Sequence, residues 1–307
     1  MAHNRIIFIG TSEFAAQVLE YMIERKFLPC LIITKDSPVS LIAQKLNIEV
    51  LKPKKIKDIT NEIKDKKPEL LILCAYGEKI PKEILDIPDK GCLNLHPSLL
   101  PLYRGATPIT QAILDDQDKT GVTVILMNEE FDAGSIIKQK EVNIKKNVSW
   151  LDLSQELALK GGELLLKVIP LWLEDKIKAI KQDDSKATYT KTMKKQDGLI
   201  DWSCSAQEIE RKVRALNPWP GTFSFFQDPK TKEKKMIKIL EAGIQKQTSD
   251  GPFGKIGQVY MATNEELAVQ TGQDFLIIKK LQIQGGKPML TKEFINGNVS
   301  FIDTILK

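Results

Sequence analysis

Short apolar runs of β-type residues alternate with amphipathic stretches through the first part of the chain. The first amphipathic stretch carries Phe14, Val18, Leu19 and Met22 at the helical period. Strands that alternate with helices form a parallel sheet, because each helix carries the chain back across one face of it. We therefore predict a Rossmann-like, doubly wound, mostly parallel α/β domain. The apolar runs place its strands at Arg5–Ile9, Cys30–Thr34, Leu70–Ala75, Gly91–Leu95 and Val122–Met127.

The pattern changes in the second part of the chain. Ser149–Ile177 predicts an amphipathic helix that breaks near Gly161-Gly162, and a polar stretch follows it. From Phe223 onward, short β-type runs separated by Gly, Pro and Asp predominate, which is typical of a small β-barrel. We expect a catalytic domain over residues 1–185, a linker over 186–205 and a smaller OB-like β-barrel over 206–307.

Composition excludes several classes of protein. The formal net charge of +5 permits contact with a polyanion without demanding it. Cys30, Cys74, Cys92 and Cys204 are widely spaced, which indicates structural thiols in a reducing compartment. No apolar stretch approaches the roughly 18 residues of a membrane span, and the residues before the first strand are too polar for a secretory signal. We expect a cytoplasmic monomer without membrane contact.

The chemistry is expected at the exit of the fourth strand. Asn94 and His96 are two residues apart, so both side chains point to the same face of that strand. Ligands of doubly wound sheets bind beyond the carboxyl ends of the strands. A lone histidine in an apolar region is more often a core residue, but the stiff turn Pro97–Pro101 would hold this imidazole in a fixed place. We therefore take His96 as a candidate catalytic residue.

Asp132 is the candidate third member of the site. It precedes Ala133-Gly134 in a loop after the strand Val122–Met127, and such a turn can direct the carboxylate inward. The alternative, an aspartate chosen only for its turn chemistry, has equal weight at this stage. If the three side chains converge, the asparagine can donate to an oxyanion, the histidine can move a proton and the aspartate can stabilise the imidazolium.

Other reaction types lack their motifs. There is no G-x-S-x-G nucleophile elbow, and no reactive-cysteine environment flanks His96. Gly10-Thr11-Ser12 is not a G-x-G-x-x-G loop, so dinucleotide binding has no support. These absences favour direct transfer between two bound substrates.

The segment Asn94–Pro101, with Tyr103-Arg104-Gly105-Ala106 and Asp132-Ala133-Gly134, closely resembles the 10-formyltetrahydrofolate-dependent formyltransferases. The resemblance extends from Ala75-Tyr76-Gly77 to Asn217-Pro218-Trp219-Pro220 and so covers nearly the whole chain. It is greatest to the members that act on methionyl-tRNA. Formyltransferases acting on nucleotide sugars and purine precursors share the first-domain motif, and the second domain distinguishes the tRNA enzymes from them.

The resemblance implies the roles of individual residues. Asn94, His96 and Asp132 would form the catalytic trio, and no metal would be required. The formyl donor would be 10-formyltetrahydrofolate, and the acceptor the α-amine of methionine on initiator tRNA. Phe14 would pack against the methionine side chain, although a core role is at least as well supported. The folate site would include Ser98, Leu99, Leu100 and Pro101.

Basic residues of the second domain are candidates for contacts with tRNA. Nearly all basic residues are lysines, and arginine occurs only at Arg5, Arg25, Arg104, Arg211 and Arg214. The planar guanidinium group suits carboxylate or phosphate, whereas lysine would serve for solubility alone. Arg211 and Arg214 share one helical face and can address phosphates, with a solvated face as the equal alternative. A lysine run in a predicted hairpin is a second candidate patch: Lys230, Lys232, Lys234, Lys235 and Lys238.

The chain departs from the family at one place. Where the family carries a basic loop that reaches the tRNA acceptor end, Lys35–Ser40 here leads directly into a helix. The predicted chemistry is unaffected, and the departure bears only on tRNA recognition. An N-formyltransferase acting on an amino sugar nucleotide or another small amine is therefore the alternative function.

Overall fold

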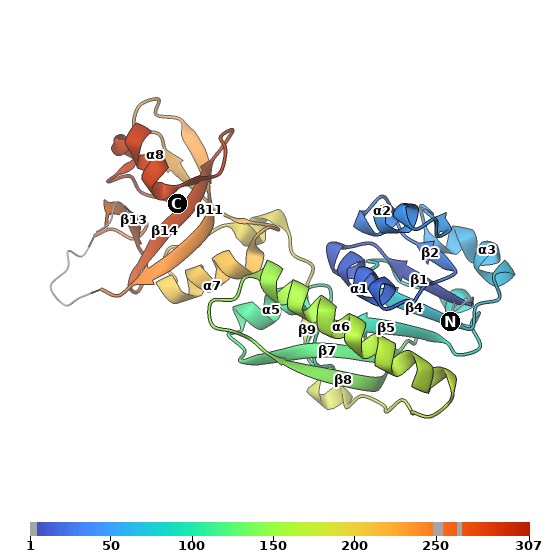
Figure 1. Ribbon diagram of the computed structural model, residues 1–307. Helices are drawn as coiled ribbons and strands as arrows, with labels where there is room; N and C mark the ends of the chain where they lie inside the picture. Colours follow the sequence, from blue (N-terminus) through green and yellow to red (C-terminus); the bar gives the residue numbers. More distant parts are fainter. Residues whose placement is uncertain (1–4, 248–253, 263–265) are drawn as a thin grey trace. The chain divides into compact units, whose positions relative to one another are not determined.

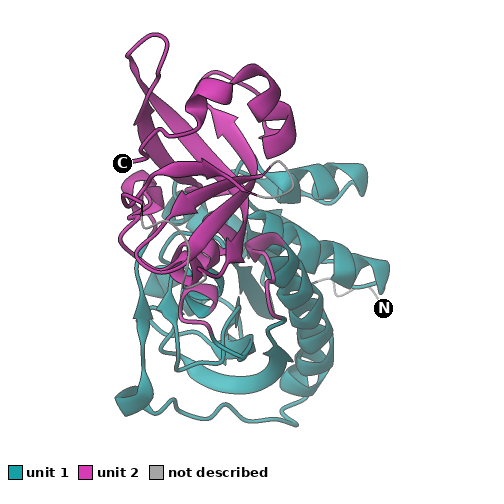
Figure 2. Ribbon diagram, turned by 90° about the vertical axis from the view of Figure 1, so that its left-hand side faces the viewer, with its two compact units in different colours: residues 1–112, 117–145, 152–192 teal, residues 113–116, 146–151, 193–307 magenta. Residues whose placement is uncertain are grey.

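The computed structural model describes residues 5–247, 254–262 and 266–307, which form two compact units (Figure 2). Unit 1 comprises residues 1–112, 117–145 and 152–192, and unit 2 comprises residues 113–116, 146–151 and 193–307. The expected linker over 186–205 is not a separate segment. Its first part pairs with unit 1 through strand β9, Tyr189–Thr190, whereas Trp202 lies in the core of unit 2. Both halves make hydrogen bonds or core contacts that a free linker lacks.

Unit 1 is built on a seven-stranded sheet of order β3-β2-β1-β4-β5-β7-β8 (Figure 1). The first five strands in this order are parallel, and β7 and β8 are antiparallel additions. This confirms the predicted mostly parallel sheet. A separate two-stranded sheet joins β6, Arg104–Gly105, to β9. The main strands are β1 Ile6–Gly10, β2 Leu31–Ile33, β3 Val50–Leu51, β4 Leu70–Cys74, β5 Cys92–His96, β7 Lys119–Leu126 and β8 Ser135–Asn143.

Helices cover both faces of this sheet (Figure 1). Helices α1 and α6 lie on one face, where α6 contacts Leu95 of β5 and Tyr21 of α1. On the other face, apolar side chains from η1, Ile56–Ile59, and from α3 and α4 pack against β1, β2, β4 and β5. Alternating residues of the buried strands therefore reach two separate apolar layers. The helices are α1 Glu13–Glu24, α2 Pro38–Lys45, α3 Thr60–Asp65, α4 Lys82–Leu85, α5 Pro108–Leu114 and α6 Trp150–Leu173.

Helix α6 does not break at Gly161-Gly162, so this prediction was wrong. A Cβ at Gly161 would lie 2.5 Å from a Leu95 side-chain carbon, and one at Gly162 would lie 2.7 Å from the Tyr21 ring. The glycines therefore allow α6 to approach β5 and α1 closely. The helix stays continuous because packing outweighs the intrinsic cost of glycine, about 1 kcal/mol per residue.

Unit 2 is an antiparallel sheet of order β10-β11-β14-β13-β12, with β15 paired to β14. The segment Asp303–Lys307 hydrogen bonds to Val259 of β12 and to Phe225 of β10, so it bridges the two edge strands. The sheet thereby approaches the closed perimeter of the predicted barrel. Its elements are α7 Ala206–Leu216, β10 Thr222–Gln227, β11 Lys234–Gln245, β12 Val259–Met261, β13 Leu267–Gln270, β14 Phe275–Ile283, β15 Met289–Leu290 and α8 Thr291–Gly297.

Candidate active site

Strand β5 presents Asn94 and His96 on the same face of the sheet, as the two-residue spacing predicts. Leu95 between them packs against α6 on the opposite face. Asn94 is paired with Leu73 of β4 and Ile125 of β7, so it shares a face with these apolar residues. Both polar side chains are buried. They therefore lie in a layer that excludes most solvent, where a hydrogen bond is stronger than in water.

Asp132 reaches the same place from the loop between β7 and β8. Because β7 is antiparallel to β5, this loop starts at the amino end of β5, where the Met127 amide donates to the Cys92 carbonyl at 2.8 Å. The argument from strand carboxyl ends therefore does not apply to Asp132. Its backbone is left-handed, with φ of 52°. A Cβ at Gly134 would lie 2.0 Å from the Leu126 carbonyl oxygen, so this return of the loop requires glycine.

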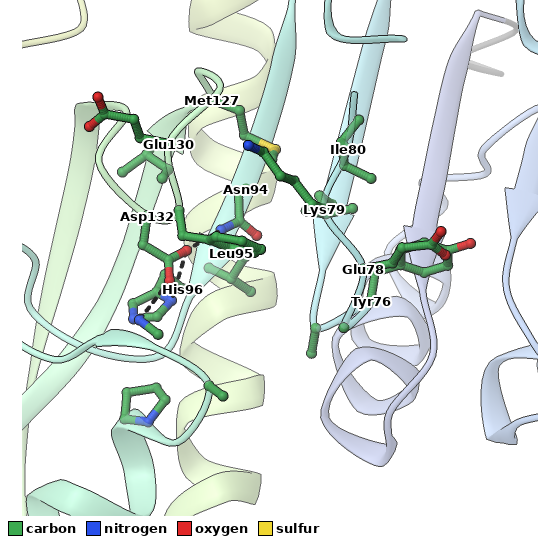
Figure 3. Close-up of a pocket in the computed structure, with 18 of the residues that line it drawn as sticks. Tyr76, Glu78, Lys79, Ile80, Asn94, Leu95, His96, Met127, Glu130 and Asp132 are labelled. Atoms are coloured by element: carbon green, nitrogen blue, oxygen red, sulfur yellow. Dashed lines mark hydrogen bonds and ion pairs between the residues drawn. The ribbon is translucent and has the colours of Figure 1, made fainter. Parts of the chain in front are cut away.

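The three side chains converge on one carboxylate oxygen (Figure 3). Asn94 Nδ2 donates to Asp132 Oδ1 at 3.3 Å, and His96 Nδ1 lies 3.4 Å from the same oxygen. The other oxygen, Oδ2, accepts from the Gly105 amide at 2.8 Å. Asp132 is thus held by a backbone donor while one of its oxygens faces both candidate partners.

The contacts of His96 indicate where its protons lie. Nε2 is 2.9 Å from the Tyr103 carbonyl oxygen. A carbonyl only accepts, so Nε2 carries a proton in this contact. Nδ1 is then the ring nitrogen without this proton, and it lies 3.4 Å from Asp132 Oδ1. This arrangement suits a residue that accepts a proton during a reaction.

A cavity of about 520 Å³ opens beside the trio (Figure 3). Its walls come from the segments after β1 and β4, from the end of β5 and from the β7–β8 loop, together with Gly105, Ala106, Pro108 and Thr192. Apolar side chains of Leu73, Ile80, Ile125 and Met127 form part of the wall beside Asn94. A mainly apolar cavity with a few convergent polar groups is the usual form of a small-molecule site.

Tyr76 and Glu78 contribute polar groups to another part of the cavity wall (Figure 3). Tyr76 Oη is buried and finds no hydrogen-bond partner in the described part of the chain. Burial, with a smaller contribution from Glu78, raises the pKa of Tyr76 to about 12, so the phenol keeps its proton. Lys35 Nζ lies 3.9 Å from Glu78 Oε2. The short segment after β2 thus contacts a residue of the cavity wall.

The cysteines are free thiols and offer no activated nucleophile. Cys92 precedes Asn94 by two positions on β5, and burial raises the pKa of its thiol to about 12. Burial likewise raises the pKa of Cys74. Both therefore stay protonated near neutral pH, whereas the thiolate is the nucleophilic form. The geometry agrees with a reaction that needs no covalent enzyme intermediate.

Ser98, Leu99, Leu100 and Pro101, predicted for the folate site, do not line this cavity, whose lining ends at Pro97 in this segment. Ser98 Oγ donates to the Leu102 carbonyl at 2.6 Å, and the Leu100 amide donates to Thr123 Oγ1 at 3.2 Å. These bonds fix the turn after β5 and so hold His96 in place. Direct contact of the four residues with folate stays a prediction.

The predicted substrate-binding residues have other partners in their own units. Phe14 is buried in α1 and is not part of the cavity lining. In unit 2, Arg214 Nε donates to both oxygens of Glu210 at 2.7 and 2.9 Å, and Arg211 pairs with Asp116. These ion pairs engage part of each guanidinium group, and contacts with tRNA phosphates remain predictions. The lysine run lies in and after the β10–β11 hairpin, where Lys235 pairs with Asp228 at 2.7 Å.

Several cavity residues received no role from the sequence. Ala75–Ile80 follow β4 at its carboxyl end, beside β1, where the strand order reverses, and that position is a signal that could have marked them. Gln182, which bonds to the Asp132 loop, gave no such signal because it lies in a polar stretch.

In the residues that the structure describes, no group of three or more His, Cys, Asp or Glu is placed to hold a metal ion. No helix of the described ranges is long and apolar enough to cross a membrane.

Comparison with known proteins agrees with this geometry. The family model "Formyl transferase" matches residues 5–169, and "Formyl transferase, C-terminal domain" matches residues 192–299. Methionyl-tRNA formyltransferase of Clostridium novyi (strain NT) is 34% identical over 317 residues, covering 99% of this chain and all of the relative. The enzyme of that name from Carboxydothermus hydrogenoformans is 36% identical over 307 residues, covering 95% of this chain and 96% of the relative.

Solved structures share the fold. HypX from Aquifex aeolicus, in complex with tetrahydrofolic acid, superposes with a TM-score of 0.71 at 18% identity, covering 98% of this chain and 48% of HypX. An N-formyltransferase from Helicobacter canadensis, in complex with folinic acid and dTDP-3-aminofucose, superposes with a TM-score of 0.65 at 18% identity, covering 91% and 98%. At these identities the likeness concerns the fold alone. On its sequence relatives and both family models, the chain belongs to the formyl transferase family.

Proposed function

We propose that this chain transfers the formyl group of 10-formyltetrahydrofolate to the α-amine of methionine carried by initiator tRNA. The observation that supports this most is the match of both domains, at 34% identity over 99% of the chain, to an enzyme named methionyl-tRNA formyltransferase. The trio Asn94, His96 and Asp132 beside a cavity of about 520 Å³ supplies groups suited to the chemistry.

The reaction exchanges one carbon–nitrogen bond for another. The amine nitrogen attacks the formyl carbon and forms a tetrahedral oxyanion. Collapse of this intermediate breaks the bond to N10 of the folate. The amine loses one proton and N10 gains one, so no redox partner is needed. Charge at the oxyanion and proton movement between nitrogens are therefore the two demands on the protein.

The chain's own side chains can meet both demands. Asn94 uses one N–H on Asp132, and its second N–H, for which the described residues give no acceptor, can donate to the oxyanion. His96 can accept the amine proton at Nδ1, and Asp132 Oδ1 at 3.4 Å faces the cation that results. The apolar wall formed by Leu73, Ile80, Ile125 and Met127 suits the flat ring system of the folate.

The purified protein is expected to formylate methionyl-tRNA when 10-formyltetrahydrofolate is supplied. The measurement is acid-precipitable formyl-methionyl-tRNA formed from labelled donor, with uncharged tRNA as the control because it lacks the amine. An amino sugar nucleotide is tested in parallel. Transfer to the sugar but not to charged tRNA would reject the proposed acceptor and favour the alternative of a small-amine formyltransferase, which the short Lys35–Ser40 segment keeps open.

Affinity for tRNA is expected to fall as salt concentration rises, since lysine side chains that bind phosphates release counterions. Replacing the exposed Lys230 and Lys232 with glutamine should flatten the plot of log affinity against log salt, by about one unit of slope for each lysine that binds a phosphate. Lys54→Gln, an exposed lysine of unit 1, is the matched control. Fluorescence anisotropy of labelled tRNA measures the affinity, and a slope unchanged in the double variant would rule out the hairpin as a tRNA-binding element.

That the protein is a monomer and that it acts in the cytoplasm stay predictions.

A further inference from the structure

We propose that Gln182 and Arg104 are positioning residues that set the place of the Asp132 carboxylate for the reaction. This inference rests on the proposed formyl transfer. Neither residue belongs to the cavity lining, and both act through the loop that carries Asp132.

Gln182 fastens that loop through its backbone. Its Nε2 donates to the carbonyl oxygens of Asp132 and Gly134, each at 2.7 Å. Its Oε1 accepts from Arg104 Nε at 3.1 Å and from Arg104 Nη2 at 2.8 Å. The side-chain amide has two donors and two acceptor sites, so every one of them is used. Carbonyls only accept and guanidinium only donates, so the orientation of the amide is determined without ambiguity.

Strand β6, which carries Arg104 and Gly105, acts on Asp132 by two routes. Arg104 binds Gln182 through its side chain, and Nη2 also donates to Asp184 Oδ1 at 2.7 Å. Its chain neighbour Gly105 donates its amide to Asp132 Oδ2 at 2.8 Å. The same strand, β6, therefore holds the carboxylate directly and the loop backbone through Gln182. Arg104 is 3% exposed and Gln182 is 5% exposed, so water does not compete strongly for these bonds.

The loop turns sharply at Asp132. Its φ of 52° lies in the left-handed region, which few residues with a Cβ occupy and which aspartate tolerates better than most. Relaxation of this backbone would move Oδ1 away from Asn94 and His96, which it meets at 3.3 and 3.4 Å. A displacement of about 1 Å in a catalytic group can cost on the order of 10² in rate.

The central test is Gln182→Glu. A carboxylate can still accept from Arg104, but it cannot donate to the two loop carbonyls. We expect kcat to fall about 10- to 100-fold, with KM for both substrates changed less than 3-fold, because the cavity wall is intact. Gln44→Glu makes the same chemical change at an exposed position of α2 and is expected to keep normal kcat. Thermal unfolding of each variant checks that it is folded.

A second readout separates positioning from a merely structural role. The chain has only two histidines, so a His3→Asn background leaves the imidazole of His96 as the single ring signal in a ¹⁵N spectrum. Asp132→Asn provides the reference displacement of the ring resonances and of their pH profile. Gln182→Glu should displace both in the same direction. Unchanged His96 resonances in a folded Gln182→Glu protein would overturn the proposal, whatever its kcat.

Arg104→Lys keeps a positive charge but cannot give two parallel donors to Oε1 of Gln182. We expect kcat to fall and the His96 resonances to shift in the same direction as in Gln182→Glu, but by a smaller amount. Normal kcat and normal resonances in this variant would remove Arg104 from the proposal. A protein that fails to formylate methionyl-tRNA would refute the proposed function. The spectra need no substrate, so they would still test whether Gln182 and Arg104 position Asp132.

Discussion

Replacing His96 with alanine is expected to lower kcat for formyl transfer by about 10²- to 10⁴-fold, the range for loss of a positioned general acid or base. In the proposed reaction, Nδ1 of His96, which lies 3.4 Å from Asp132 Oδ1, accepts the amine proton. KM for methionyl-tRNA should change little because the ring is small relative to the whole substrate. Single-turnover measurement of formyl-methionyl-tRNA isolates the chemical step from product release.

Two further variants make the His96 result interpretable. His96→Gln can still donate to the Tyr103 carbonyl, which His96 meets at 2.9 Å, but it cannot take up a proton. It should therefore remain folded and be nearly as slow as the alanine variant. His3→Ala removes the other histidine of the chain and should have normal kcat. A glutamine variant with near-normal turnover would contradict a proton-accepting role for this residue.

Asn94→Ala is expected to lower kcat by about 10²- to 10³-fold, the usual cost of removing one oxyanion donor. The loss should fall on kcat and kcat/KM alike, since in the proposed reaction the second N–H of Asn94 meets a charged oxygen only in the transition state. Asn94→Asp preserves the size of the side chain but replaces donors with a negative charge beside Asp132, so we expect it to be at least as slow.

Asn61→Ala is the matched control for this pair, because Asn61 is exposed on α3. It should have wild-type kcat and stability. An Asn94→Ala enzyme that instead raises KM with kcat unchanged would show that the amide binds ground-state substrate. That result would remove Asn94 from the oxyanion site while leaving His96 and Asp132 in place.

Most of the fold could be predicted from local pattern. The apolar runs at Leu70–Ala75 and Gly91–Leu95 correspond to β4 and β5, and the short β-type runs expected after Phe223 correspond to β11, β13 and β14. Buried strands and amphipathic helices are marked by the spacing of apolar residues within a short stretch of chain, so this spacing is sufficient to predict them. Strand β8, by contrast, carries alternating lysine and glutamine at an edge and offered no apolar run.

The site was less predictable wherever contacts join distant segments. Spacing alone predicts that Asn94 and His96 share one face, whereas the sequence supports convergence of Asp132 and a simple turn role equally. Convergence depends on the antiparallel direction of β7 and on the tight return at Gly134, which no local pattern encodes. Gln182 lies 50 positions from Asp132 in a polar stretch, so only the folded chain shows its role in the loop.

The strand order has a consequence for how such enzymes diverge. The segment Lys35–Ser40 follows β2, whereas the trio is carried by β5 and the β7–β8 loop, and β1 and β4 lie between β2 and β5. At about 4.8 Å per strand, the two regions are separated by roughly 14 Å of rigid sheet. Insertions or deletions after β2 can therefore accumulate without displacing the reacting groups.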